Sequence, residues 1–414
     1  MWIVNLVICF TLAEYLFSLY VNLRQWKRYK IKTLPDELKA VATEEEFIKS
    51  QNYGFDKISF SMVKTYVSTL ETILILYFNV IPYIWEKSHD FLLCFGLEGE
   101  IYQALAYSYV LMLIGIFDDL PFSLYSTFAI EERYGFNKTT MKEFIKDILK
   151  NTLVTAAITG VVLPILLWII DWGGEYFYLY VWGFLTVVIL VISHIYHDWI
   201  AQLYNTFTEL EDGTLKTAIN ELAKRLKFPL KNIYVVDGDR RSEHSNAYFF
   251  GFWKNKRIVL FNTLLKKEKN ISEDEIIAIL AHELGHWKLS HFLKGILILE
   301  LQILVMFYLF GKVMYTQELY RQFGFSKQNS FIGLMLFSYI YAPVNVVLSI
   351  ILTFRSRRQE FQADAFAKKN DYGDLLKTAL IKIHTQNSGN IYPDPLYSAI
   401  NFSHPPLLER LKAL

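Results

Sequence analysis

Seven stretches of this chain are apolar over about 20 residues each, which is the length that an α-helix needs to cross the hydrocarbon core of a bilayer. The chain of 414 residues is 53% hydrophobic and only 20% charged, so it is too apolar for an ordinary globular protein of this length. We therefore expect an all-α membrane protein with about seven transmembrane helices and a water-exposed part. The apolar stretches lie near residues 2–23, 66–85, 104–122, 152–170, 177–195, 293–314 and 331–354.

Basic residues next to the helix ends predict how the chain is oriented. The segments RQWKRYKIK (24–32) and KTTMKEFIKDILK (138–150) are rich in Lys and Arg, whereas DWGGE (171–175) has neither. Because basic loops stay on the cytosolic side, the N-terminus is expected on the opposite side. The first stretch has no basic residues before it and no clear small-residue cleavage site, so it is predicted to be an anchor and not a signal peptide.

These predictions divide the chain into four segments. A membrane segment with five helices (1–196) precedes a cytosolic segment that contains the stretch HELGH (197–292), and two further helices (293–354) precede a cytosolic C-terminal segment (355–414). Two spans separate the two cytosolic segments, so both are expected on the same side of the membrane. Side chains from the two cytosolic segments can therefore meet in one site.

The stretch AHELGHWKLSH (281–291) predicts a catalytic zinc site. Residues i and i+4 lie on one face of a helix, so His282 and His286 can direct ring nitrogens at one ion. Glu283 is then placed to take a proton from water and not to bind the metal. The alternative interpretation is a polar helix face with two surface histidines. His291 is expected to point to another face of the same helix, in a structural or solvated role.

A catalytic zinc takes three protein ligands and leaves one position open, so a third ligand is expected elsewhere. The best candidate lies in SRRQEFQADAFAKK (356–369), where Glu360 and Asp364 are again four residues apart. Glu360 would bind the metal, and Asp364 would accept a hydrogen bond from one ligand histidine and fix its tautomer. The alternative is a solvated charged face just outside the membrane. The only cysteines, Cys9 and Cys94, lie in apolar surroundings and argue against a thiolate site.

The zinc motif and several other segments resemble the type I CaaX prenyl proteases, which are integral-membrane zinc peptidases of eukaryotic endomembranes. The similarity is carried by HELGHW, SRRQEFQADAFA and SHPPLLERL, and also by FIKSQNYGFDKISF, DLPFSLYSTFAIEERYGFNKTT and DGDRRSEHSNAYFFGF in the first two thirds of the chain. It covers nearly the whole chain, including the membrane half that soluble peptidases with the same motif lack.

The resemblance implies a fold and a set of site residues. Seven helices would form a barrel around a large water-filled chamber, next to a zincin-like domain with a small β-sheet and one Zn²⁺ per chain. The metal ligands would be His282, His286 and Glu360, with Glu283 as the base and later the acid. Asn246 would contact the substrate backbone, while His404 and Arg410 would lie close to the metal, where a donor can stabilise an oxyanion. For His404 and Arg410, helix capping and packing is the alternative role.

The same resemblance implies the reaction. The substrate would be a prenylated CaaX protein or peptide that loses its last three residues, and some family members cut a farnesylated precursor a second time upstream. The expected location is the endoplasmic reticulum membrane or also the inner nuclear membrane, in contact with membrane lipid and with the zinc domain on the cytosolic or nucleoplasmic side. A formal net charge of +1 gives no reason to expect nucleic acid as a partner.

Two alternative functions stay open from the sequence. The first is a broad quality-control peptidase for membrane proteins, although such chains have fewer spans. The second is a non-catalytic factor, for example one that clears translocons, with a structural metal. Such a site has no need of a general base, so the presence of Glu283 argues against it.

Overall fold

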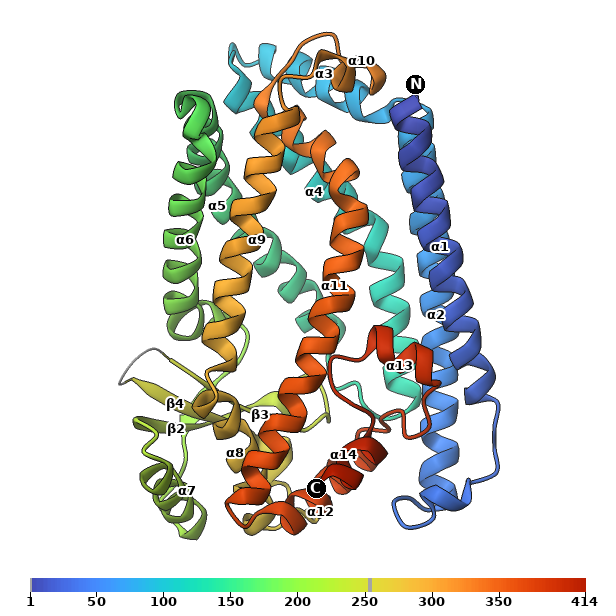
Figure 1. Ribbon diagram of the computed structural model, residues 1–414, viewed down its shortest axis with the longest axis vertical. Coiled ribbons are helices and arrows are strands. Elements are labelled where there is room, and N and C mark those ends of the chain that lie inside the picture. Colours follow the sequence, from blue (N-terminus) through green and yellow to red (C-terminus); the bar gives the residue numbers. More distant parts are fainter. Residues whose placement is uncertain (1, 252–254) are drawn as a thin grey trace.

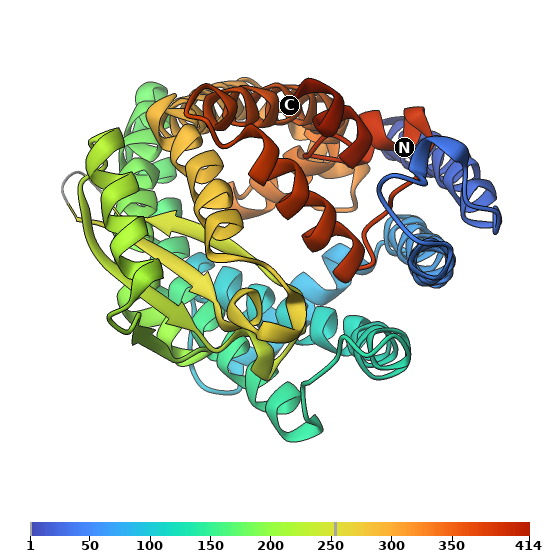
Figure 2. The same cartoon turned by 90° about the horizontal axis from the view of Figure 1, so that it is seen from below.

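The computed structural model describes residues 2–251 and 255–414, apart from the side chains at 197 and 198. Long helices run between two ends of the molecule (Figure 1), and seen along their length they are arranged around a ring (Figure 2). In the described residues, six helices and one bent helix pair are long and apolar enough to cross a membrane. The prediction of a helical membrane protein with about seven spans is thus confirmed. The ring contains α1 (Trp2–Tyr29), α2 (Glu44–Tyr77), α4 (Glu100–Tyr125), α5 (Met141–Trp172), α6 (Phe177–Ile195), α9 (His291–Val313) and α11 (Ser330–Lys369).

The second predicted span, 66–85, is wrong as a single straight helix. α2 ends at Tyr77, and α3 (Val80–Leu93) starts after a bend of 70°. Asn79 between them has a φ of 51°, in the left-handed region. Pro82 in the first turn of α3 has no N–H, and its ring would clash with the carbonyl group of Phe78 in a continuous helix. As a result α3 lies across one end of the ring (Figure 1), and α2 alone runs along it.

A small mixed sheet lies at the other end of the ring. Its strand order is β1-β2-β4-β3, in which β2 and β4 are parallel and the other neighbours are antiparallel. β3 is therefore an edge strand. The helix α7 (Thr214–Leu226) lies on the same side of the molecule (Figure 1). The strands are β1 (Phe207–Glu209), β2 (Leu230–Val236), β3 (Ala247–Phe250) and β4 (Lys256–Phe261).

The helix α8 (Glu273–Lys288) carries the HELGH motif through the core of this end of the molecule. It begins with a capping box, in which Ser272 Oγ accepts from Glu275 N and the Glu275 carboxylate accepts from Ser272 N. α8 packs against the edge strand β3, against α12 (Gly373–Gln386), and against the end of α11. α11 is 40 residues long, so it extends from the ring into this core and brings Glu360 to α8.

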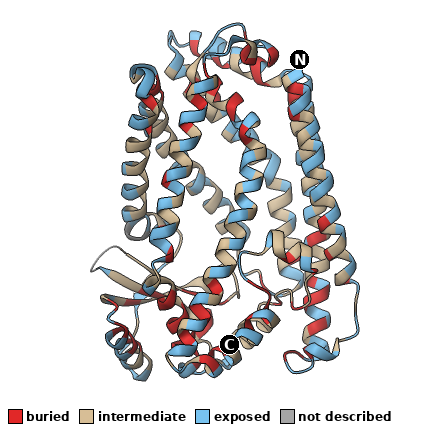
Figure 3. Ribbon diagram, in the orientation of Figure 1, coloured by how far each residue is buried: buried red, intermediate tan, exposed pale blue. Residues whose placement is uncertain are grey.

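Burial differs along the length of the molecule. Buried residues gather at the sheet end and at the opposite end of the molecule, near α3, while exposed residues are frequent in the middle of the long helices (Figure 3). Of the carboxylates in the apolar stretches, Glu300 is buried and accepts a hydrogen bond from Thr186 Oγ1 at 2.6 Å. Asp118 and Asp119 are exposed. Exposed charge within a span suits a wall that faces water.

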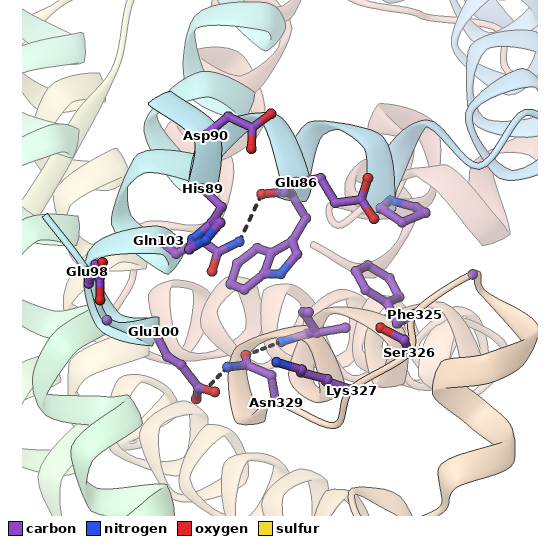
Figure 4. Close-up of a pocket in the computed structure, with 15 residues that line it drawn as sticks. Glu86, His89, Asp90, Glu98, Glu100, Gln103, Phe325, Ser326, Lys327 and Asn329 are labelled. Atoms are coloured by element: carbon purple, nitrogen blue, oxygen red, sulfur yellow. Dashed lines mark hydrogen bonds between the residues drawn. The ribbon is translucent and has the colours of Figure 1, made fainter. Parts of the chain in front are cut away.

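The opposite end is closed by α3, α10 (Gln317–Gln322) and the loop that leads into α11 (Figure 1). A hollow of about 520 Å³ lies there, between α3, the start of α4 and this loop (Figure 4). Hydrogen bonds from Asn329 to Glu100 and from Gln103 to the Trp85 carbonyl group hold its walls together. The hollow contains none of the predicted site residues, so the chemistry predicted from the sequence belongs to the sheet end.

Candidate metal and active site

The structure brings His282 and His286 of α8 together with Glu360 of α11. One ligand atom from each of the three lies within 4.8 Å of the others. The Nε2 atoms of His282 and His286 are 3.2 Å apart, and Glu360 oxygens lie 3.5 Å and 3.2 Å from them. His282 and Glu360 are buried, and His286 is partly exposed.

Asp364 determines which nitrogen of His282 faces the cluster. One turn after Glu360, its carboxylate accepts from His282 Nδ1 at 2.8 Å. Because Nδ1 carries the proton in this hydrogen bond, Nε2 of the neutral ring presents a lone pair to His286 and Glu360. Burial lowers the pKa of His282, but its hydrogen bonds to Asp364 and Glu360 raise it more, to about 9. A metal at this point would therefore displace a proton when it binds.

His291 is buried and lies against His286, so the prediction that it continues the helix and points to another face was wrong, whereas a structural role is compatible with its burial. Its Nδ1 is 3.0 Å from His286 Nδ1, and its Nε2 is 3.0 Å from Gln362 Oε1. The helix does not continue to His291, because α8 ends at Lys288 and Ser290 has a φ of 57°. His291 therefore begins a new helix and turns back toward the cluster. The relay His286 to His291 to Gln362 fixes the tautomer of His286, so its Nε2 also presents a lone pair.

These contacts fit a bound cation. Two imidazole lone pairs and one carboxylate point at a common centre, an arrangement that is repulsive unless a positive charge lies between them. Ligands bound to one tetrahedral zinc at about 2.0–2.1 Å are about 3.3 Å apart, and the observed separations are 3.2–3.5 Å. The buried Glu360 Oε2 accepts no hydrogen bond from the described residues, although His404 Nδ1 lies 2.8 Å away at an ion-pair distance.

Glu283 follows the first of these histidines on α8. It is half-buried, and burial raises the pKa of its carboxyl group, while interactions with the nearby histidines oppose this rise. A carboxyl group with a raised pKa next to a cation site can take up a proton and give it back during one reaction.

The C-terminal segment contributes two more of the predicted residues. Arg410 of α14 (Leu407–Ala413) is buried and binds the Asp364 carboxylate through Nε at 2.9 Å and Nη2 at 2.7 Å. Burial lowers the pKa of this guanidinium, but Asp364 and the other nearby carboxylates raise it overall, so Arg410 stays charged. The His404 side chain is 66% exposed, in the loop between α13 (Pro395–Asn401) and α14. It can therefore meet both the cluster and a bound molecule.

Asn246 lies at the start of the edge strand β3. Its side chain is exposed, and its Oδ1 accepts from Ala247 N at 2.8 Å. Its carbonyl group accepts from Phe261 N on β4 at 3.1 Å, so the backbone here belongs to the sheet. No contact joins Asn246 to the cluster within the described ranges, and its predicted role stays a prediction.

Comparison with known proteins gives consistent matches over the whole chain. Residues 25–206 match a family described as the CAAX prenyl protease N-terminal region with five membrane helices, and residues 209–414 match peptidase family M48. A CAAX prenyl protease 1 homolog of Oryza sativa subsp. japonica is 43% identical, over 99% of this chain and 96% of that protein. One of Homo sapiens is 44% identical, over 99% of this chain and 94% of that protein. The crystal structure of S. mikatae Ste24p has a TM-score of 0.93 and 36% identity, and the match covers 99% of this chain and 98% of that one.

Proposed function

Because the chain belongs to the CAAX prenyl proteases of peptidase family M48, we propose that it is a membrane zinc endopeptidase that removes the aaX tripeptide from prenylated CaaX proteins. The observation that carries this function is the cluster of His282, His286 and Glu360, with Glu283 beside it, at one end of a ring of membrane helices. The membership implies a metal cofactor, and the ligand set of two histidines and one carboxylate is typical of catalytic zinc.

The three ligand residues would hold the zinc, which supplies a Lewis acid that polarises the scissile carbonyl group and makes the attacking water more acidic. Glu283 takes the proton of that water and passes it to the amine that leaves. Asp364 and Arg410 hold His282 in the tautomer and orientation that direct its Nε2 to the centre.

The exposed His404 is placed to donate to the oxyanion that develops on the scissile carbonyl group. β3 is an edge strand, so its outer side can add an extended substrate as a further strand, and Asn246 lies next to its first residue. An antiparallel peptide on this edge would add a fifth strand to the sheet next to α8.

The enzyme would act in the endoplasmic reticulum membrane, with a second location in the inner nuclear membrane and the site on the cytosolic side. Both basic segments, 24–32 at the end of α1 and 138–150 at the start of α5, lie at the same end of the ring as the sheet (Figure 1), which supports this orientation. The full-length similarity, including the membrane half, does not favour a quality-control peptidase of fewer spans. The presence of Glu283 beside the ligands argues against a structural metal.

The test is release of the aaX tripeptide from a farnesylated CaaX peptide by the purified protein in detergent. Glu283→Gln should lower kcat by about 10²–10⁴-fold, because the general base is lost, and it should keep one zinc per chain by metal analysis. The matched control is Glu221→Gln on the exposed face of α7, which should cleave like the wild type. An unprenylated peptide should be cleaved poorly.

Other outcomes would change the assignment. Equal cleavage of the prenylated and unprenylated peptides would point to a broad peptidase. Absence of cleavage in a protein that contains zinc would contradict an enzymatic function, and cleavage that survives Glu283→Gln would contradict the role of Glu283.

A further inference from the structure

A second cavity, of about 370 Å³, opens beside the metal cluster. Pockets of this size are typical of small-ligand sites. It lies between the C-terminal half of α12 and the segment that connects α13 to α14, and it reaches His404 and Arg410. No carboxylate is among its lining residues, and the polar ones are His384, Asn390, Asn401, Ser403, His404 and Arg410. A wall with donors and without acidic groups suits an anionic ligand.

Asn390 lines this cavity and has an unused donor. Its Oδ1 accepts from Tyr392 N at 3.2 Å, which identifies that atom as the oxygen and leaves Nδ2 as the opposite atom of the amide. Nδ2 is buried and has no hydrogen-bond partner among the described residues. Buried donors are almost always paired, so an unpaired one at a cavity indicates a missing partner.

His384 presents a second unpaired polar atom in the same wall. Its Nε2 is buried and also lacks a partner in the described part of the chain. The ring lies close to Gly389, where an added Cβ would be 2.7–2.9 Å from the ring atoms, so the absence of a side chain at Gly389 leaves room for the imidazole. Burial lowers the pKa of His384, against an opposing hydrogen bond to the Asn390 backbone.

The direction of the edge strand leads a bound peptide toward this cavity. Antiparallel pairing is the more stable choice for an added strand. A peptide that runs antiparallel to β3 passes Phe250 first and Ala247 last, and then leaves over Ser245. Ser245 N donates to Asn387 Oδ1 at 3.3 Å, which connects this end of β3 to the end of α12 that carries His384. The residues on the C-terminal side of the scissile bond would therefore point into the cavity.

We propose that this cavity holds the three residues that leave, and that Asn390 Nδ2 donates a hydrogen bond to their C-terminal carboxylate. The inference rests on the proposed function, because it explains how the enzyme would select a bond at a fixed distance from the C-terminus of that substrate. Three extended residues span about 10 Å, so a fixed contact for the carboxylate selects the bond three residues from the C-terminus. Asn390 acts as a specificity residue and does not touch the scissile bond.

The experiment compares two farnesylated peptides that differ only at the C-terminus, one with a free carboxylate and one with a carboxamide. A hydrogen bond to a charged group should make KM for the free acid lower by roughly tenfold or more in the wild type. Asn390→Asp keeps the oxygen that accepts from Tyr392 N and replaces the donor by a second oxygen. It should raise KM for the free acid by at least about tenfold and leave the carboxamide nearly unchanged. Asn220→Asp, on exposed α7, is the matched control and should behave like the wild type.

The outcomes separate this inference from the function on which it rests. If the wild type cleaves both peptides with the same KM, the carboxylate contact does not exist, although the enzyme is a CaaX protease. The same conclusion follows if Asn390→Asp retains the preference for the free acid. If the wild type cleaves neither peptide, the proposed function is wrong and the inference is overturned with it. The comparison of the two peptides on the wild type needs no variant, so it remains decisive if Asn390→Asp does not fold.

Discussion

The helices α8, in the core at the sheet end, and α4, in the membrane ring, show how differently two regions of one molecule are stabilised. In α8, ten of 16 residues are buried, and they include the first metal ligand. In α4, only Ala104 and Tyr107 of 26 residues are buried, although this helix is much more apolar. The side chains packed around α8 stabilise it. α4 is stabilised by its own backbone hydrogen bonds and by the membrane that a span of this kind crosses. A site that needs distances within a few tenths of an ångström belongs in the first kind of structure.

α11 joins these two kinds of structure in a single helix. Its apolar part belongs to the ring, and its last turns bury Glu360, Ala363, Asp364 and Ala367 against the α8 core. A displacement of the ring would therefore reach the site mainly through α11. This comparison predicts that equal substitutions have unequal effects in the two regions.

The largest difference is expected for a leucine truncated in each region. Leu280 of α8 is 1% exposed in the core, and Leu280→Ala should destabilise the sheet end by about 2–5 kcal/mol because it leaves a cavity. Leu113 of α4 is 49% exposed, and Leu113→Ala should change the stability by less than about 0.5 kcal/mol. Thermal unfolding of both variants in the same detergent measures the difference. A similar loss of stability in both would show that α4 is packed against a partner in solution.

A glycine pair gives a smaller effect of the same kind. A Cβ at Gly285 of α8 would lie 3.1–3.2 Å from Phe366 and Ala363 of α11, whereas a Cβ at Gly115 of α4 would meet nothing within 4 Å. Gly285→Val should therefore push α8 from α11 and destabilise by about 1–3 kcal/mol. Because His282, His286 and Glu360 would also move apart, the zinc content should fall. Gly115→Val should keep both the zinc and the melting temperature, and a loss of zinc there would contradict the separation of the two regions.

The sequence predicted the parts of this molecule that depend on local spacing. Apolar length identified the spans, and the i, i+4 pattern predicted which side chains of α8 and α11 face a common point, as the structure places them. The direction of His291 was predicted wrongly, because α8 ends at Lys288 and a new helix begins at His291. The turn depends on a left-handed conformation at Ser290, which a serine in the sequence does not predict. Pro82 is a local signal for the bend before α3. It is a weak signal, because Pro121, Pro164 and Pro343 lie inside continuous helices of the same chain.

Contacts between distant segments could not be read from spacing. Asn390 and His384 share a cavity with Arg410 only because α12 folds back over α14. The unpaired atoms that mark this cavity depend on which hydrogen bonds the folded chain leaves unmade. The resemblance to a family could name His404 and Arg410, but it offered no reason to consider Asn390.

The smallest predicted effect concerns the Glu275 carboxylate, which belongs to the capping box of α8 and also forms an ion pair with Lys382 of α12. Glu275 Oε2 accepts from Ser272 N and from Lys382 Nζ, both at 2.8 Å. Burial raises the pKa of Glu275, but the hydrogen bonds from Lys382 and Ser272 outweigh it and lower the pKa overall. A carboxyl group whose pKa is lowered in the folded state stabilises the protein above its unfolded pKa of about 4.3, and this contribution is lost as the pH falls toward the folded value.

Glu275→Gln keeps the capping hydrogen bond and removes the charge, so it should destabilise by about 1 kcal/mol at pH 7. The difference in melting temperature between the wild type and the variant should then shrink as the pH is lowered below about 4.3. The matched control in the ring is Asp119→Asn, which removes an exposed ion pair with Lys64 and should change the melting temperature little at pH 7. If the Glu275→Gln difference grew toward low pH, the sign of the pKa shift would be wrong. If Asp119→Asn had the larger effect at pH 7, exposed pairs would hold the ring more firmly than buried contacts hold α8.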